Sequence, residues 1–375
     1  MGCVLFFVGQ SANNAISDTV RRDAACLAKR GKQVTIVDLT QPLELPEPAD
    51  VDMIVSYQAW GHDLATADGH RYADLAGCPF IVVLGDHPIH HAARILACPK
   101  TSVFCVGSQN QMTFLRDVLN VSGDIHLLPA GMFAEQVRRD GPRDIGALVI
   151  GHAQDPAAFL AAQKLPPALN EIIAAFAERP LSEPDVAPIM DYMRSGFDRV
   201  MQIVGNEASA VSVGRLIDLV SRRHFRWRYF QVLRKMPVTF VGDDWEKIPR
   251  EGDDAFTAQP SIPFKALAEV YARARICLNL HPPYYDFHER LIDAMTQGAA
   301  VATPETALLQ SRFDFGQNIL ALPVKVEETG PWLEAQLSEP AALATIGQAG
   351  REIVEREYGY EKPVDLFLGV LAAKG

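Results

Sequence analysis

Short apolar runs alternate with helix-forming stretches through the first 140 residues, and this alternation is what most limits the possible folds. The runs lie at residues 4–8, 34–39, 53–56, 80–84, 103–106 and 125–128. Each has the length and apolar content of a strand that is buried on both faces of a sheet. Strands separated by helices lie parallel and are joined by right-handed crossovers. The first half is therefore predicted to be a doubly wound domain, and no GxGxxG fingerprint of dinucleotide binding follows its first strand.

The same alternation returns after a turn at residues 140–143, which we take as a domain boundary. Strands are expected at 147–150, 239–241, 276–280, 299–302 and 319–322. Helical stretches separate the first two of these strands, at 166–179, 184–206 and 209–235. We predict an α/β chain with Rossmann-like domains at 1–140 and 141–361, the second with a helical insertion at 165–235. The helix expected at 362–375 is a candidate to rejoin the first domain.

The segment 275–303 places a loop at 281–288 between a strand and a helix that begins at Glu289. In an open α/β sheet, ligands bind beyond the carboxyl ends of the strands. The free N–H groups and the positive dipole at a helix start attract anions to the same place. A phosphate bound there would lie close to His288 and Arg290, so the segment predicts an anion site.

A purely structural interpretation of these residues also stays open. Asp286 and Glu289 have the spacing of a capping box, which would only close the helix end. Arg290 and Asp293 lie three residues apart on the helix and would then form no more than a surface ion pair.

Eight residues of the segment match a family pattern: Asn279, His288, Glu289, Arg290, Ala294, Met295, Gly298 and Thr303. The segment resembles the C-terminal domain of GT-B glycosyltransferases, most of all the spore-maturation-type branch of the glycosyl transferases group 1. VTFVGDDW at 238–245 and RDIGALVIGHA at 143–153 resemble two more pieces of that domain, so the likeness covers most of 143–320 in order. Many retaining members carry two glutamates seven residues apart here. This chain has Asp293 at the second position and Tyr285 or Asp286 near the first.

The resemblance implies that a sugar moves from a nucleotide-sugar donor to an acceptor hydroxyl, in a cleft between two Rossmann-like domains that face each other. No cofactor and no metal are expected, because a helix end and Arg290 can stabilise the leaving diphosphate. Glu289 would hydrogen-bond hydroxyls of the donor and take part in catalysis. The implied donor-binding residues are Gly242, Asp243, Trp245, Asn279, His281, His288, Glu289, Arg290 and Asp293.

Two other functions fit the same fold. A nucleotide-sugar epimerase would act on the donor itself with a carboxylate and a histidine. A GT-B-like binding protein would have lost catalysis, and the aspartate at position 293 keeps that alternative open.

The acceptor side is expected in two loops of the first domain. Gly9, Gln10 and Asn13 follow the first strand. Asp86 and His87 begin the loop GDHPIHH at 85–91, at the carboxyl end of the fourth strand. Either side chain is a candidate catalytic base or acceptor contact. A zinc site that also uses His90 and His91 is an alternative, although no Cys or Glu completes a recognisable spacing, and a solvated loop is another.

Bulk properties limit the partners. The net charge of −11 argues against a nucleic-acid or anionic membrane surface, and no stretch is apolar enough over its length for a membrane helix. The six cysteines form no CxxC pair and most lie in apolar runs, which is typical of reduced thiols in a cytoplasmic protein. The acceptor would be a glycan, a lipid-linked molecule or a protein, and the oligomeric state stays open.

The stretch SRRHFRWRYFQVLRK at 221–235 mixes arginines with aromatic residues, a pattern that also occurs in RNA-binding proteins. Its helical spacing and the acidic character of the chain favour another interpretation. Phe225, Tyr229 and Val232 are expected to pack against the core while the arginines are solvated.

Overall fold

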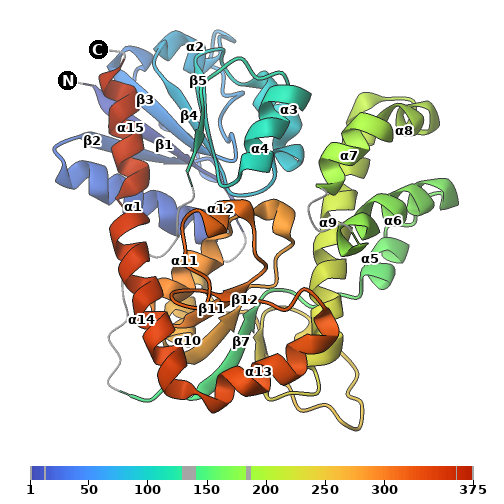
Figure 1. Cartoon of the computed structure of the whole chain (residues 1–375). Coiled ribbons are helices and arrows are strands. Elements are labelled where there is room, and N and C mark those ends of the chain that lie inside the picture. Colours follow the sequence, from blue (N-terminus) through green and yellow to red (C-terminus); the bar gives the residue numbers. More distant parts are fainter. Residues whose placement is uncertain (1, 12–13, 129–140, 183–186, 360, 374–375) are drawn as a thin grey trace. The chain divides into compact units, whose positions relative to one another are not determined.

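The computed structural model describes the chain except for residues 1, 12–13, 129–140, 183–186, 360 and 374–375 (Figure 1). The chain divides into two compact units. The first comprises Met1–Ala134 and Gly359–Gly375, and the second comprises Glu135–Tyr358.

The first unit is built on a parallel sheet with the strand order β2-β1-β3-β4-β5-β6. Its strands are β1 (Cys3–Val8), β2 (Gln33–Asp38), β3 (Val51–Tyr57), β4 (Phe80–Leu84), β5 (Ser102–Val106) and β6 (Ile125–Leu127). Every residue of β1 is buried, because helices cover both faces of the sheet, and the strand therefore reads as a continuous apolar run. The predicted doubly wound sheet is confirmed.

The helices of the first unit include the last one of the chain. They are α1 (Ala15–Lys29), η2 (Pro48–Asp50), α2 (Tyr72–Ala76), η3 (Pro88–His91), α3 (Ala92–Ala97), α4 (Gln109–Thr113), η4 (Phe114–Val118) and α15 (Lys362–Ala372). Val364 and Phe367 of α15 are fully buried in one core cluster with Phe6 of β1. Arg30 at the end of α1 also pairs with Glu361 at 2.8 Å. The end of the chain thus completes the hydrophobic core on one face of this sheet.

The second unit holds another parallel sheet, with the order β12-β11-β10-β7-β8-β9. Its strands are β7 (Ile145–Ile150), β8 (Val238–Val241), β9 (Thr257–Gln259), β10 (Ala274–Leu278), β11 (Ala300–Thr303) and β12 (Leu320–Ala321). All but β9 have counterparts among the predicted strands. β9 has three residues, none of them fully buried, at the edge of the sheet, so it leaves no apolar run in the sequence.

The predicted helical insertion is confirmed between β7 and β8. It consists of α5 (Pro156–Ala162), α6 (Pro167–Ser182), α7 (Pro188–Ser195), α8 (Phe197–Val204) and α9 (Glu207–Leu233). The remaining helices of this unit are η5 (Trp245–Lys247), η6 (Phe264–Ala266), α10 (Leu267–Arg273), η7 (Pro283–Tyr285), α11 (Glu289–Thr296), α12 (Ala307–Gln310), η8 (Val326–Glu328), α13 (Thr329–Ser338) and α14 (Pro340–Glu357). In the described part of the chain, none of the helices combines the length and the apolar character needed to cross a membrane.

The long helix α9 belongs to two hydrophobic cores, and Figure 1 shows it running from beside α7 to the sheet of its own unit. Its first half packs Val213, Ile217 and Val220 among the helices of the insertion. Its second half packs Tyr229 and Phe230 against the second sheet. The helix therefore fixes the insertion to the sheet, and the stretch between the two cores lies beside the loops described next.

Candidate active site

The start of α11 is closed by a histidine. The Nδ1 atom of His288 accepts a hydrogen bond from the main-chain N–H of Arg290 at 3.3 Å. The capping box predicted from Asp286 and Glu289 is therefore wrong. Asp286 lies two residues before the N-cap, with a positive φ of 53° at the end of η7, so its carboxylate cannot take the N-cap position.

The loop before α11 is tied to α9 through a buried carboxylate. Asp218 is fully buried and accepts hydrogen bonds from the hydroxyls of Tyr284 at 3.3 Å and Tyr285 at 3.0 Å. Arg222, one turn further along α9, pairs with the same carboxylate at 2.8 Å. These contacts hold the loop in place and partly neutralise Arg222.

Two histidine rings contact each other at a tilt inside this loop. The rings of His281 and His288 lie 3.8 Å apart, and the ring of Tyr285 contacts His281 edge-on at 4.7 Å. Burial lowers the pKa of both imidazoles well below the usual value, and nearby arginines, Arg290 among them, lower it further. Both rings are therefore neutral at pH 7, which keeps Nδ1 of His288 available as an acceptor for the helix cap.

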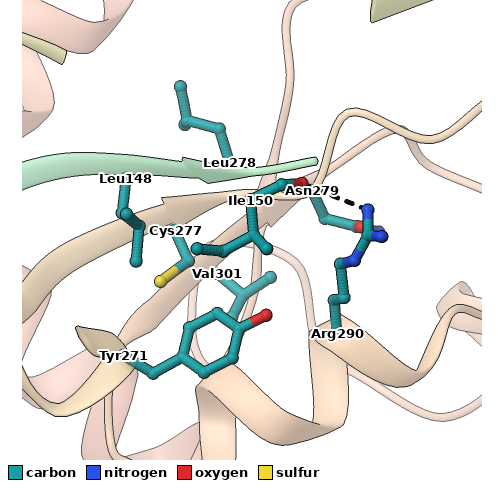
Figure 2. A pocket seen from close by; sticks show the side chains of 8 residues that line it. All are labelled: Leu148, Ile150, Tyr271, Cys277, Leu278, Asn279, Arg290 and Val301. Atoms are coloured by element: carbon teal, nitrogen blue, oxygen red, sulfur yellow. Dashed lines mark hydrogen bonds between the residues drawn. The ribbon is translucent and has the colours of Figure 1, made fainter. Parts of the chain in front are cut away.

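Arg290 extends from the first turn of α11 to the end of β7. Its Nη1 atom donates to the carbonyl oxygen of Ile150 at 3.1 Å, and Figure 2 shows this contact beside Asn279 in a small pocket. Asn279 follows β10 and donates from Nδ2 to Oγ1 of Thr303 at 3.1 Å. The alternative of a surface pair between Arg290 and Asp293 is wrong, because Asp293 is only 2% exposed. Its burial also removes it from the surface that a donor could reach.

Arginines of α9 complete a cationic cluster with Arg290. Nη1 of Arg226 donates to the carbonyl oxygen of His152 at 3.0 Å. Burial lowers the pKa of Arg226 to about 9, and the charges of Arg290, Arg222 and Arg223 add to this shift. In the part of the chain that the structure describes, Arg226 and Arg290 form no ion pair with a carboxylate. The two guanidiniums thus lie together with main-chain carbonyls as their partners.

The expectation that the arginines of 221–235 are solvated is therefore wrong. Arg223 is likewise half-buried, with its guanidinium 3.7 Å from the ring centre of Phe159 and a hydrogen bond of 2.9 Å to Gln154. The other half of the prediction is confirmed, since the core of the second unit contains Tyr229 and is packed by Phe225 and Val232.

Two glycines bring the loops after β7 and β8 together. A side chain at Gly242 would place its Cβ 2.1 Å from the carbonyl oxygen of Gly151, and φ is positive at both residues. His152 and Asp243 then pair across the loops at 3.0 Å, with both side chains about half exposed. Trp245 was predicted to bind the donor, but its burial contradicts this prediction. It is 1% exposed, and its Nε1 donates to Gly151 at 2.5 Å, so it holds the glycine loop from behind.

The predicted donor residues that stay accessible thus gather at the carboxyl ends of β7, β8 and β10. Glu289 is partly exposed there, with a carboxylate oxygen 3.3 Å from Nδ1 of His288. Sequence reasoning missed the contributions of Gly151, His152 and Arg226. A helix start, a glycine-lined loop and two guanidiniums that have no carboxylate partner in the described part of the chain make this end of the sheet suitable for a polyanion.

The predicted acceptor loops lie in the first unit. The Cβ of a side chain at Gly9 would come 2.9 Å from the ring of Trp60, so the turn after β3 covers the loop after β1. Gln10 is exposed, and Asn13 lies outside the described residues. Asp86 is exposed at the end of β4. His87 is instead 3% exposed, packs on Phe114, and accepts the N–H of Ile89 at Nδ1, so the geometry favours Asp86 over His87 as an acceptor contact.

Comparisons with known proteins give the class of this fold and site. The glycosyl transferase-like family matches residues 222–369, which include Arg226, the loop before α11 and α11 itself. A search of curated proteins found no match. The two sheets and their connections match those of solved glycosyltransferases along the whole chain, so the chain has the GT-B fold that the sequence predicts.

Three of the similar structures illustrate the breadth of the match. Sucrose-phosphate synthase from Thermosynechococcus elongatus is 13% identical, with a TM-score of 0.57 over 100% of both chains. HepE from Anabaena in complex with UDP-glucose is 11% identical, with a TM-score of 0.55 over 100% of both chains. A glycosyltransferase from Rickettsia africae is 9% identical, with a TM-score of 0.52 over 99% of this chain and 98% of the other. At such low identity these structures establish the fold.

Proposed function

We propose that this protein is a glycosyltransferase that uses a nucleoside diphosphate sugar as donor and stabilises the leaving diphosphate with side chains in place of a metal ion. The observation that carries the proposal is the cluster of Arg226 and Arg290, whose guanidiniums donate to the carbonyl oxygens of His152 and Ile150 at the end of β7 and form no ion pair with a carboxylate among the described residues. A half-buried arginine that lacks a carboxylate is unfavourable, and a diphosphate would supply the missing negative charges.

The proposed chemistry follows from this charge arrangement. In the transfer, the bond between the anomeric carbon and the phosphate oxygen breaks, and the electron pair goes to the diphosphate. The acceptor oxygen forms the new bond to the anomeric carbon and loses its proton. Arg226, Arg290 and the N–H groups of α11 would stabilise the diphosphate as its charge grows. Glu289, partly exposed at the same helix start, is placed to bind hydroxyls of the transferred sugar.

The acceptor is assigned to the first unit. Asp86 is exposed at the carboxyl end of β4, and a carboxylate can take the proton of an acceptor hydroxyl in an inverting reaction. A retaining reaction would use the same residue only to position the acceptor. HepE contains UDP-glucose in its solved structure, which makes uridine diphosphate the first nucleotide to test.

Calorimetric titration with UDP, GDP, ADP, CDP and dTDP tests the donor site. The wild type should bind at least one of them in EDTA, and Arg290→Ala should lose most of that affinity with little change in melting temperature. Arg273→Ala is a matched control. Arg273 pairs with Asp144 at the amino ends of β10 and β7, whereas the candidate donor site lies at the carboxyl ends of the strands. Failure of the wild type to bind any of the five nucleotides would overturn the proposal.

Product analysis with the matching nucleotide-sugars separates the alternative functions. Release of the nucleoside diphosphate is the expected result. Isomerisation of the sugar without release would point to an epimerase, and binding without turnover to a non-catalytic protein. Loss of nucleotide binding in EDTA that returns with Mn²⁺ or Mg²⁺ would refute the metal-independent part of the proposal.

A further inference from the structure

Three polar side chains meet at the carboxyl ends of β3 and β4 in the first unit. Gln58 follows β3, whereas Asp86 and His91 follow β4. Nε2 of Gln58 donates to Oδ2 of Asp86 at 3.4 Å, and Nε2 of His91 lies 3.9 Å from the same oxygen, beyond hydrogen-bonding distance. β3 and β4 are neighbours in the sheet, which brings residues that are distant in the sequence together.

The amide of Gln58 is buried and incompletely bonded. Gln58 is 5% exposed, and its Oε1 atom is buried without a hydrogen-bond partner among the described residues. A buried carbonyl oxygen in this state loses its hydration without a replacement, which is unfavourable. The atom therefore marks a position where a donor group of a ligand would be stabilised.

The main chain at this position is strained and firmly held. Gln58 and Ala59 both have a φ of +57°, which is unfavourable for residues with a side chain. The N–H of Gln58 donates to Val83 at 2.9 Å, and Nη1 of Arg94 donates to the carbonyl oxygen of Gln58 at 3.1 Å. Two successive residues kept in this region by surrounding contacts are typical of ligand sites.

His91 adds a neutral ring with unused bonding capacity. Its side chain is 11% exposed, and its two ring nitrogens are buried and have no hydrogen-bond partner among the residues that the structure describes. Burial lowers the pKa of His91 and outweighs the opposing effect of the Asp86 carboxylate, so the ring is neutral at pH 7. It offers one donor and one acceptor nitrogen.

The charges around the cluster are of opposite sign and give it no net preference for a strongly charged ligand. Arg94 contacts the turn and would repel a cation, whereas the half-exposed carboxylate of Asp86 would repel an anion. The groups available are an amide oxygen, a carboxylate and a neutral imidazole. Hydroxyl groups suit all three, because a hydroxyl both donates and accepts.

We propose that Gln58, Asp86 and His91 form a binding site for a neutral polyhydroxylated molecule, a saccharide. Its role as the acceptor site rests on the proposed glycosyl transfer, whereas the binding itself does not. The acceptor is then a glycan, or the glycan part of a larger molecule.

Sugar binding by the full chain tests the site directly. Saturation-transfer NMR with glucose, galactose, mannose and N-acetylglucosamine, together with a glycan array, would report neutral ligands, and glucosamine and glucuronic acid serve as cationic and anionic probes. Hydrogen exchange with and without the best sugar would locate binding, with protection expected at residues 57–61 and 85–91. Gln58→Gly should weaken binding by about tenfold, the scale of one lost buried hydrogen bond.

Ala59→Gly is the matched control, because it relieves the same positive φ at the neighbouring position without removing a polar group. It should bind sugar within about twofold of the wild type. Equal affinity of both variants, protection elsewhere, no neutral sugar bound, or tighter binding of a charged probe would each overturn the proposal. Titration of the same samples with the five nucleoside diphosphates keeps the two hypotheses apart. Nucleotide binding without sugar binding would support the donor site and refute the saccharide site. Sugar binding without nucleotide binding would support the saccharide site and refute the donor site.

Discussion

Replacing Arg226 by methionine is expected to stabilise the protein while it weakens diphosphate binding. Methionine keeps much of the length and apolar character of the arginine side chain and removes its charge. The pKa of Arg226 is lowered from 12.5 to about 9, a difference of about 3.5 units, and each unit corresponds to about 1.4 kcal/mol. The charged side chain therefore costs the folded protein about 5 kcal/mol as an upper limit.

Two effects reduce the net gain. The substitution removes the hydrogen bond to His152, worth about 1 kcal/mol, and solvent screens part of the charge of a half-buried group. We expect the free energy of unfolding to rise by about 1–3 kcal/mol, or about 2–4 °C in melting temperature for each kcal/mol in a unit of this size. Nucleoside diphosphate affinity should fall by about 10- to 150-fold, because a charge-assisted hydrogen bond contributes about 1.5–3 kcal/mol.

Urea denaturation followed by tryptophan fluorescence and titration with UDP would measure both effects. Arg234→Met provides the contrast on the same helix. Arg234 is buried and pairs with Asp254 at 2.7 Å and Glu251 at 2.8 Å, so its loss should cost about 3–5 kcal/mol with no change in nucleotide affinity. If Arg226→Met destabilises the protein as Arg234→Met does, Arg226 has a compensating partner and the reasoning is refuted. Unchanged affinity would separate Arg226 from the anion site.

Three further predictions concern other parts of the molecule. Asp218→Asn leaves Arg222 without its carboxylate and should cost about 3 kcal/mol in urea denaturation; a loss below 1 kcal/mol would show that the contact contributes little. His281 and His288 have lowered pKa values in the folded protein, so only the unfolded chain takes up protons just below pH 6.5. Stability should therefore be constant above about pH 6.5 and fall below it by up to about 1.4 kcal/mol per pH unit for each histidine, and a flat profile between pH 5 and 7 would contradict this. Asp86→Asn should slow transfer by about 100-fold if Asp86 is a base with nucleotide affinity unchanged, and a wild-type rate would exclude that role.

The two sheets could be predicted because parallel strands covered on both faces must be apolar along their whole length. β1 and β4 are visible in the sequence for this reason, with nearly every position buried. β9 is not, since an edge strand of three partly or fully exposed residues has no such pattern. Trp245 shows the converse error. It follows a glycine turn, as a ligand-binding residue would, and only the packing of Phe230 and Phe240 on its ring reveals a core position.

The candidate donor site was only partly predictable. His288 and Arg290 were found because a loop between a strand and a helix start is a local pattern. Arg226 was missed because solvated and ligand-facing arginines have the same spacing on a helix. Only the contact of Arg226 with His152, in the loop after β7, shows that this arginine faces the candidate site. One signal was present. Arg222 and Arg226 lie four residues apart, and like charges at that spacing destabilise a helix unless something neutralises them.

The double role of α9 restricts how this chain can change its length. Between Val220 in one core and Phe225 beside the other, an inserted residue would rotate the two halves of the helix by about 100° relative to each other. Either the insertion would lose its packing or Arg226 would turn away from the loop after β7. Four inserted residues, just over one turn, would nearly restore the orientation. Natural length variation is thus expected in the connections between α5, α6, α7 and α8, and inside α9 only in steps of a helical turn.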